Sequence, residues 1–179
     1  SWMGNIEEFA IWNQSLTQDK ISEHAGAKIV DYSQYGNNGT RRFNSTSDFG
    51  RNFTDGKFGK ALLFDGVNDY VKMNATSLNL SSSLSLAAWV KTTDTDATII
   101  MKADANSGTN AQYGMWINNN GNVNHYRSTG VVNNVVSSNA LVNTGEWVHI
   151  VGTYDGSDLK IYINGLLNNK SNIGSVTYT

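Results

Sequence analysis

The sequence predicts an all-β protein built from antiparallel strands, and a few short segments carry this prediction. Residues 84–91, 147–150 and 159–163 alternate with a period of two, which is typical of strands with one buried face. Asn-Gly dipeptides at 120–121 and 164–165 follow strand-like runs, and both central residues of a tight type I′ hairpin turn need positive φ. The pattern therefore indicates antiparallel sheet with short connections.

The N-terminal segment contains a strand-like run followed by the one helical element that the sequence predicts. Thr17 is a candidate N-cap of this short helix, with Asp19 favourably placed in the first turn and Ile21 facing the core. Ser15 with Gln18 three residues later is an alternative capping box. The two choices differ by half a turn, and both remain open.

Two polar connections separate the predicted strands without dividing the chain into domains. Residues 31–55 carry isolated aromatic rings in a polar stretch, which indicates a long loop pinned by those rings rather than a linker. Residues 94–112 form a second polar connection, interrupted by a short strand predicted at 98–101. The chain of 179 residues is therefore interpreted as a single domain, 1–179, long enough to bury a sizeable core.

Composition and charge exclude several classes of function. The formal net charge is −2 and no run of Lys or Arg occurs, so the basic surface of a nucleic-acid-binding protein is missing. No apolar stretch approaches the roughly 20 residues that a membrane-spanning helix needs. Cysteine is absent, so no disulfide can form and no thiolate can bind metal or attack a substrate.

Four motifs cover most of the chain: GKALLFDGVNDYV at 59–71, LSLAAWVK at 84–91, GEWVHIVGTYDGSDLKIYINGLL at 145–167 and GNIEEFAIWNQSLTQDKI at 4–21. Together they resemble the motifs of laminin-G-like, concanavalin-A-like jelly rolls. The resemblance implies a two-sheet antiparallel jelly-roll sandwich with one short helix. It also implies that Phe64 and Val71 are buried and that Asp65-Gly66 forms a turn between two strands.

The order of these motifs departs from the family, because the usual closing strand comes first. Residues 1–23 are interpreted as this displaced strand with its helical turn, and residues 24–179 as the remainder of the sandwich. The chain is then a self-contained permuted domain or a stretch cut from a tandem array of such domains. Alternatively, it is a subunit that donates its first strand to a neighbour and so covers an exposed sheet edge. The pattern does not distinguish these cases. The donated residues would be Asn5, Ile6, Phe9, Ile11 and Trp12.

Catalysis is not expected of this chain. Retaining glycoside hydrolases of similar architecture use two carboxylates about 5 Å apart, but their Glu-x-Asp-x-x-Glu arrangement is missing here. Glu7 and Glu8 are consecutive, so in a strand they point to opposite faces and cannot act as an acid-nucleophile pair. His24, His125 and His149 have no Ser or Cys nucleophile nearby at a sharp turn. The sequence therefore predicts a protein that is not an enzyme.

Asp65, Asn68 and Asp69 are the candidate ligands for calcium, the one cofactor to consider. They place three oxygen-bearing side chains within five residues, and calcium prefers several oxygen ligands in loops. Members of the resembled family often carry calcium at the rim of the sandwich. The alternative is turn chemistry, in which Asp and Asn side chains bond to their own backbone.

A carbohydrate site needs flat aromatic rings for the apolar faces of pyranoses, with Asn, Asp or His side chains to read the hydroxyls. One hairpin offers this combination, in residues Trp116, Asn118, Asn120, His125 and Tyr126. The alternation also places Trp89 and Tyr162 together on a face other than the core face. The competing interpretation is structural, because aromatic residues of sandwiches more often fill the core or cover a sheet.

The sequence therefore predicts a non-catalytic extracellular or cell-surface module for adhesion and recognition, with carbohydrate as the default ligand class and glycans or surface proteins as partners. The alternative is a glycosylated subunit or repeat of a surface filament, assembled with identical subunits or adjacent repeats by strand donation. A prokaryotic cell surface would suit the missing cysteines and the Asn-x-Ser/Thr sequons. The sequons lie at Asn13, Asn38, Asn44, Asn52, Asn74, Asn79 and Asn169.

Overall fold

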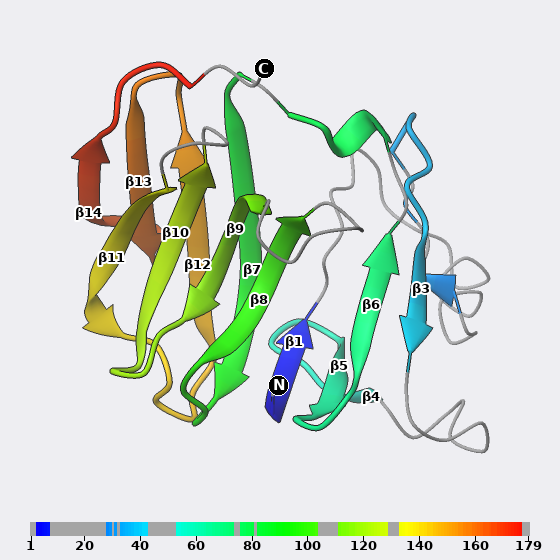
Figure 1. The fold of residues 1–179 in the computed structure, drawn as a ribbon. Coiled ribbons are helices and arrows are strands. Elements are labelled where there is room, and N and C mark those ends of the chain that lie inside the picture. The colour runs from blue at the N-terminus through cyan, green and yellow to red at the C-terminus, as the bar shows by residue number, and fades with distance from the viewer. Residues whose placement is uncertain are drawn as a thin grey trace.

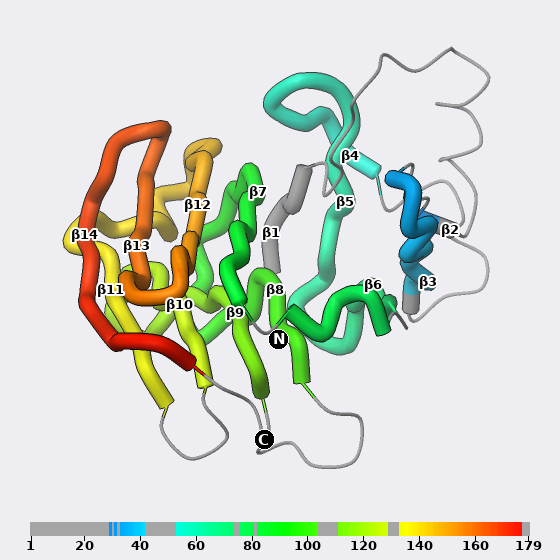
Figure 2. Tube along the Cα trace, turned by 90° about the horizontal axis from the view of Figure 1, so that it is seen from above, coloured from blue at the N-terminus to red at the C-terminus, as the bar shows by residue number. Residues whose placement is uncertain are grey.

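The computed structural model describes residues 3–7, 28–29, 31, 33–42, 53–73, 76–80, 82–103, 111–128 and 133–176. These residues form two layers of antiparallel strands that pack face to face (Figures 1 and 2). The predicted all-β, two-layer sandwich is thereby confirmed. The helical element among the described residues is a 3-10 turn, η1 (Thr76–Leu78), whereas the helix predicted after residue 15 lies outside them.

One layer is a continuous sheet of seven strands, in the order β14-β13-β12-β7-β1-β5-β4. Every neighbouring pair in this sheet is antiparallel. Figure 2 shows the layer from above, running from β14 at one edge to β4 at the other. The strands are β14 (Leu166–Asn172), β13 (Asp158–Ile163), β12 (Val148–Tyr154), β7 (Leu84–Thr92), β1 (Met3–Glu7), β5 (Lys60–Asp65) and β4 (Phe53–Asp55).

The facing layer consists of two smaller sheets that lie side by side, one of four strands and one of three (Figure 1). Their orders are β11-β10-β9-β8 and β2-β3-β6. The short strand predicted within the second polar connection is confirmed as part of β8. The strands are β11 (Asn133–Leu141), β10 (Asn122–Ser128), β9 (Ala111–Ile117), β8 (Ala97–Ala103), β2 (Lys28–Ile29), β3 (Gly39–Arg42) and β6 (Tyr70–Met73).

The N-terminal strand β1 lies in the interior of the seven-stranded sheet, between β5 and β7. Asn5 pairs with Leu63 on one side and with Lys91 on the other. The prediction that Asn5–Trp12 forms a rung of a sheet is confirmed for residues 5–7 within the strand Met3–Glu7, while residues 8–12 lie outside the described part of the chain. The described strand pairs within its own chain. Permuted connectivity and donation to a neighbour stay predictions.

The core lies between the two layers and follows the predicted alternation. In β7 the inward residues Leu84, Leu86, Ala88 and Val90 are buried, and Trp89 on the other face is only partly buried. Burial of a side chain as large as leucine contributes about 1.5–3 kcal/mol. A register slip of one residue would turn this whole row to solvent, so burial holds the register. The facing layer supplies Tyr113, Met115, Ile117, Val123, Val136 and Val142.

Two basic side chains of β10 are fully buried among these apolar residues. The Nδ1 atom of His125 lies 3.1 Å from the carbonyl oxygen of Gly114. Burial lowers the pKa of His125 to about 4, so the imidazole is neutral near pH 7. The Nη2 group of Arg127 donates to the carbonyl oxygen of Leu80 at 2.8 Å, and its Cζ atom lies 5.2 Å from the centroid of the Tyr154 ring. The carbonyl and the ring offset part of the cost of burying this cation.

The two Asn-Gly turns differ in geometry. Asn164 and Gly165 both have positive φ, at 51° and 83°, so the prediction of a tight I′ turn between β13 and β14 is confirmed. In the β9-β10 loop Gly121 has a φ of 85°, but Asn120 does not have positive φ, so the same prediction is wrong there. A Cβ atom on Gly121 would lie 2.2 Å from the Oδ1 atom of Asn143, so a larger residue would not fit without a shift.

Amide side chains close one lateral edge of the sandwich, between β11 of one layer and β14 of the other. The Oδ1 atom of Asn168 accepts a hydrogen bond from the backbone N–H of Asn139 at 2.6 Å, and the Asn168 carbonyl accepts one from the Asn139 side chain at 2.9 Å. The Nδ2 group of Asn169 donates to the carbonyl of Ser137 at 2.8 Å. These bonds occupy backbone groups that an edge strand otherwise presents to other chains.

Candidate functional site

Two of the predicted sugar-binding residues, Trp116 and Tyr126, lie together on the outer face of β9 and β10. Their ring centroids are 6.0 Å apart at an interplanar angle of 67°. With Met101 and Ala111 they line a shallow hollow of about 280 Å³. The Tyr126 hydroxyl donates to the carbonyl of Ala111 at 2.9 Å, which fixes the ring. We call this group of four residues the Trp116 hollow.

The structure separates His125 from these two aromatic residues. Successive side chains of a strand point to opposite faces, so His125 enters the core while Tyr126 faces outward. The His125 side chain is fully buried and has a lowered pKa. The expectation that His125 reads sugar hydroxyls beside Trp116 is therefore not supported by its position.

The two predicted asparagines lie in the loop between β9 and β10. The Oδ1 atom of Asn118 accepts the backbone N–H groups of Asn120 at 3.0 Å and of Asn122 at 3.2 Å, and its Nδ2 group donates to Asn124 at 3.1 Å. The Asn118 side chain thus organises the loop. Asn120 is exposed at the tip of the loop.

The predicted calcium ligands also take part in a turn, between β5 and β6. The Oδ1 atom of Asp65 accepts the backbone N–H of Val67 at 2.8 Å, and an Asp69 carboxylate oxygen accepts the N–H of Asp65 at 3.0 Å. The Asn68 N–H lies 3.4 Å from the same Asp65 oxygen. This arrangement matches the turn chemistry that is the alternative to metal binding. Within the described ranges no group of three or more His, Asp or Glu side chains is placed to hold a metal, and calcium stays a prediction.

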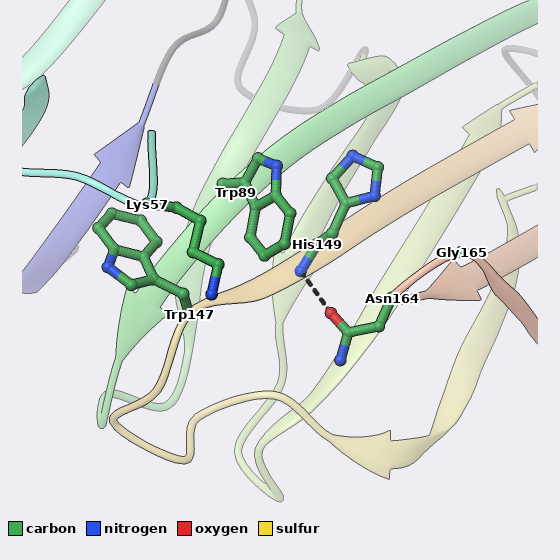
Figure 3. Close-up of a pocket in the computed structure, with 6 residues that line it drawn as sticks. All are labelled: Lys57, Trp89, Trp147, His149, Asn164 and Gly165. Atoms are coloured by element: carbon green, nitrogen blue, oxygen red, sulfur yellow. Dashed lines mark hydrogen bonds between the residues drawn. The ribbon is translucent and has the colours of Figure 1, made fainter. Parts of the chain in front are cut away.

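A larger hollow lies on the opposite side of the molecule, on the outer face of the seven-stranded sheet (Figure 3). Its volume is about 430 Å³. The side chains come from β7, from β12 and the residue before it, from the loop between β4 and β5, and from the β13-β14 turn. We call it the Trp89 hollow, and its lining residues are Lys57, Trp89, Trp147, His149, Asn164 and Gly165.

The pairing of β7 with β12 brings two aromatic rings of the Trp89 hollow together. Trp89 of β7 lies directly opposite His149 of β12 in the antiparallel register. Their ring centroids are 5.0 Å apart and the planes are tilted by 33°. Phe58 also packs edge-on against Trp89, at 5.5 Å and 78°. The Nζ atom of Lys57 lies 5.7 Å from the Trp89 ring centroid, within the range of a cation–π contact.

The β13-β14 turn forms a polar rim of the same hollow. The Asn164 side-chain oxygen accepts the backbone N–H of His149 at 2.9 Å, and the Asn164 N–H donates to the His149 carbonyl at 2.8 Å. Figure 3 shows this side chain and its hydrogen bond to the His149 backbone nitrogen. Because its oxygen is held by β12, Asn164 offers its Nδ2 group as the donor to a ligand.

The sequence indicated part of the Trp89 hollow and missed the rest. The alternation correctly predicted that Trp89 faces away from the core, but Tyr162, predicted on the same face, does not line the hollow. The other lining residues were not predicted as site residues: Lys57, Trp147, His149, Asn164 and Gly165. The available signal was the Trp147-x-His149 spacing, which puts both side chains on one face of a strand. Their proximity to Trp89 depends on strand register, which a single sequence does not contain.

Three of the seven sequon asparagines lie among the residues that the structure describes. Asn79 is exposed, and the Oδ1 atom of Asn38 accepts the backbone N–H of Asp31 at 2.9 Å. The Nδ2 nitrogen of Asn169, to which a glycan would be attached, donates to β11 as described above. The others lie outside the described residues: Asn13, Asn44, Asn52 and Asn74.

A family comparison identifies the group of proteins to which this fold corresponds. Residues 65–179, more than half of the chain, match the laminin G family described as the concanavalin A-like lectin/glucanases superfamily. Among curated proteins, none is similar enough in sequence to match. In the described part of the chain, no helix has the length and apolar character needed to cross a membrane.

Solved structures that are similar to this chain include proteins of Geobacillus, Clostridium and the mouse. Domain 4 of AbnA, a GH43 extracellular arabinanase from Geobacillus stearothermophilus in complex with arabinotriose, is 20% identical with a TM-score of 0.58, covering 86% of this chain and 77% of that one. An S-layer domain-containing protein from Clostridium thermocellum is 20% identical with a TM-score of 0.52, covering 95% and 74%. Mouse laminin alpha1 domains LG4-5 are 15% identical with a TM-score of 0.49; 58% of this chain is covered, and it spans 28% of that one.

Proposed function

The chain belongs to the laminin G family of the concanavalin A-like lectin/glucanases superfamily, and from this premise we propose that it is a non-catalytic module that binds carbohydrate through the Trp89 hollow. The observation that carries the proposal is the outward-facing Trp89–His149 ring pair, held on two central strands and bordered by polar groups. We further propose that it acts outside the cell or at the cell surface, in a prokaryote.

The chemistry of the hollow fits a sugar. A tryptophan ring exposes a flat apolar surface on which the C–H face of a sugar ring packs, and it loses little side-chain entropy because β7 holds it. Asn164 and Lys57 supply hydrogen-bond donors at the rim, where sugar hydroxyls would project. An apolar floor with a few convergent polar groups is the usual composition of a small-ligand site. The related fold solved with arabinotriose supports carbohydrate as the ligand class.

The lining residues also favour binding without hydrolysis. Retaining and inverting glycosidases both need two carboxyl groups beside the scissile bond. The described residues that line the Trp89 hollow include no Asp or Glu. This composition supports the proposal that the module recognises glycans and leaves them intact.

Glycan-array binding with Trp89→Ala tests the proposal. We expect the unaltered chain to bind at least one oligosaccharide of a broad array that includes arabinotriose, and we expect Trp89→Ala to reduce that signal at least tenfold because the stacking surface is lost. Tyr162→Ala, on the same sheet face but outside the hollow, is the matched control and should bind normally. Absence of binding to every glycan, or full binding by Trp89→Ala, would overturn the proposal.

A structural role in a surface filament is the second candidate, and the position of β1 favours it. An N-terminal strand fills a slot between β5 and β7 in the middle of a sheet, and the equivalent strand of a neighbouring subunit or repeat would fit the same slot. Such an assembly would be held by backbone hydrogen bonds along both sides of the strand. Imaging of the native protein tests this candidate, because a uniformly monomeric protein excludes strand exchange.

A further inference from the structure

A glycine lies between two of the residues that line the Trp116 hollow, on the outer face of the four-stranded sheet. Gly114 of β9 lies between Met101 of β8 and Tyr126 of β10 in the strand register. A Cβ atom at Gly114 would lie 2.7 Å from the Met101 sulfur and 2.7 Å from the Ile100 carbonyl oxygen. A larger residue at this position would therefore displace Met101, which lines the Trp116 hollow.

A polar row runs beside the Trp116 hollow. In the register Trp116 lies opposite Asn124 of β10, which in turn lies opposite Ser137 of β11. The Asn124 side-chain oxygen accepts the Ser137 hydroxyl at 2.7 Å and the Asn118 amide at 3.1 Å. These contacts hold an amide and a hydroxyl next to an indole ring. An aromatic ring with fixed polar groups beside it is the combination that recognises sugars.

The two hollows open in opposite directions. On β7 the outward Trp89 is followed by the buried Val90, and on β9 the outward Trp116 lies between the buried Met115 and Ile117. Val90, Met115 and Ile117 belong to one core cluster between the layers. The side chains that alternate with them must then point away from the core on the two outer faces of the sandwich.

We propose that the module is bivalent: the Trp89 hollow and the Trp116 hollow each bind one sugar segment, so a single chain cross-links two glycans. This inference rests on the proposed function and adds a second site and a bridging role to it. Each hollow has a small contact area, so binding at one site alone is weak. Simultaneous attachment to a polymer or a glycan-coated surface raises the apparent affinity by about 10²–10⁴ where both sites can engage.

Two measurements on the same four proteins test bivalency: the unaltered chain, Trp89→Ala, Trp116→Ala and the double variant. Isothermal titration with the oligosaccharide that gives the strongest array signal measures stoichiometry, and clumping of beads coated with that oligosaccharide measures bridging. We expect two sites and clumping for the unaltered chain. Each single variant should keep one site and lose clumping, and the double variant should lose both. Leu141→Ala, at the exposed end of β11, is a control for surface changes outside either hollow.

The outcomes separate this inference from the proposed function. If Trp89→Ala abolishes binding while Trp116→Ala leaves stoichiometry and clumping unchanged, bivalency is wrong and the single Trp89 site stands. If only Trp116→Ala abolishes binding, both the bivalent arrangement and the Trp89 site are wrong, although the module still binds sugar. If none of the four proteins binds any glycan, both proposals fail. Far-ultraviolet circular dichroism of each variant confirms that lost binding is not lost folding.

Discussion

At the residue scale, a glycine makes room for the one buried histidine described between the layers. Gly152 of β12 faces His125 of β10, and a Cβ atom there would lie 2.8 Å from the imidazole Cγ and 2.9 Å from the Met115 sulfur. The ring thus occupies space that any other residue at position 152 would take. Because the site is apolar, the ring is held in its neutral form.

The buried imidazole predicts a loss of stability in acid. Its folded-state pKa of about 4 lies below the 6.5 of an exposed histidine, so the unfolded chain binds the proton more readily. The contribution of His125 is complete above pH 6.5 and falls as pH drops from 6.5 to about 4, by roughly 3 kcal/mol in total. The free energy of unfolding from urea titrations at several pH values measures this loss.

A substitution of His125 separates its contribution to the pH dependence of stability from that of the carboxylates. His125→Leu replaces the titrating ring with an apolar side chain of similar size. The stability of this variant should therefore fall less steeply between pH 6.5 and 4 than that of the unaltered chain. His149→Leu, on the outer face of the sheet, removes a histidine from β12 and is the matched control. Parallel pH profiles for His125→Leu and the unaltered chain would show that His125 does not titrate in this way.

Period-two alternation predicted the correct face of a strand where it was applied, and His125 was misplaced because it was not applied there. The alternation of β7 correctly placed Trp89 outside the core. Trp116 and Tyr126 lie close together because they stand on adjacent strands of one hairpin, and their role in sugar binding stays a prediction. His125 was wrongly grouped with them. It directly precedes Tyr126 in the same strand, so its side chain points to the opposite face and enters the core. Period-two alternation already contained that information.

At the element scale, the strands themselves could be predicted but their order in the sheet could not. The first strand, expected as a rung over Asn5–Trp12, is described over Met3–Glu7, and its position between β5 and β7 depends on pairing with residues about 54–88 positions away. Pairing over such distances is decided by burial of both partners and by loop closure. The resemblance to a family with a closing strand was the only sequence signal for it.

The amide bonds between β11 and β14 predict a specific cost for opening this edge. Asn168→Ala removes the acceptor of the Asn139 N–H while leaving the strand backbone intact. We expect the free energy of unfolding to fall by about 1 kcal/mol, the typical net contribution of one hydrogen bond. The midpoint of thermal unfolding, Tm, should then fall by about 2–4 °C.

A neighbouring substitution controls for the asparagine change. Lys170→Ala alters the exposed side of the same strand and should stay within about 0.5 kcal/mol of the unaltered chain. Equal losses of stability from the two substitutions would contradict a stabilising role for the Asn168 hydrogen bonds.

At the scale of the whole molecule, two layers joined by long-range pairing predict slow but single-stage folding. Sandwiches dominated by non-local contacts fold in milliseconds to seconds. The chain contains no proline, so the isomerisation that delays many proteins by about 10–100 s has no substrate here. Refolding from urea, followed by tryptophan fluorescence, should be complete within seconds. A phase slower than about 10 s would show that another slow step, such as assembly or a trapped intermediate, controls folding.

Alternation and turn residues in the sequence indicated antiparallel strands, because they are local properties that act over a few residues, and the resemblance to laminin-G-like jelly rolls implied the two-layer sandwich. Tertiary structure alone decided which strands are neighbours, and hence that Trp89 meets His149 and that two hollows lie on opposite faces. The physical reason is that register and sheet order are selected by the packing of the whole core, to which every strand contributes and which no single segment specifies.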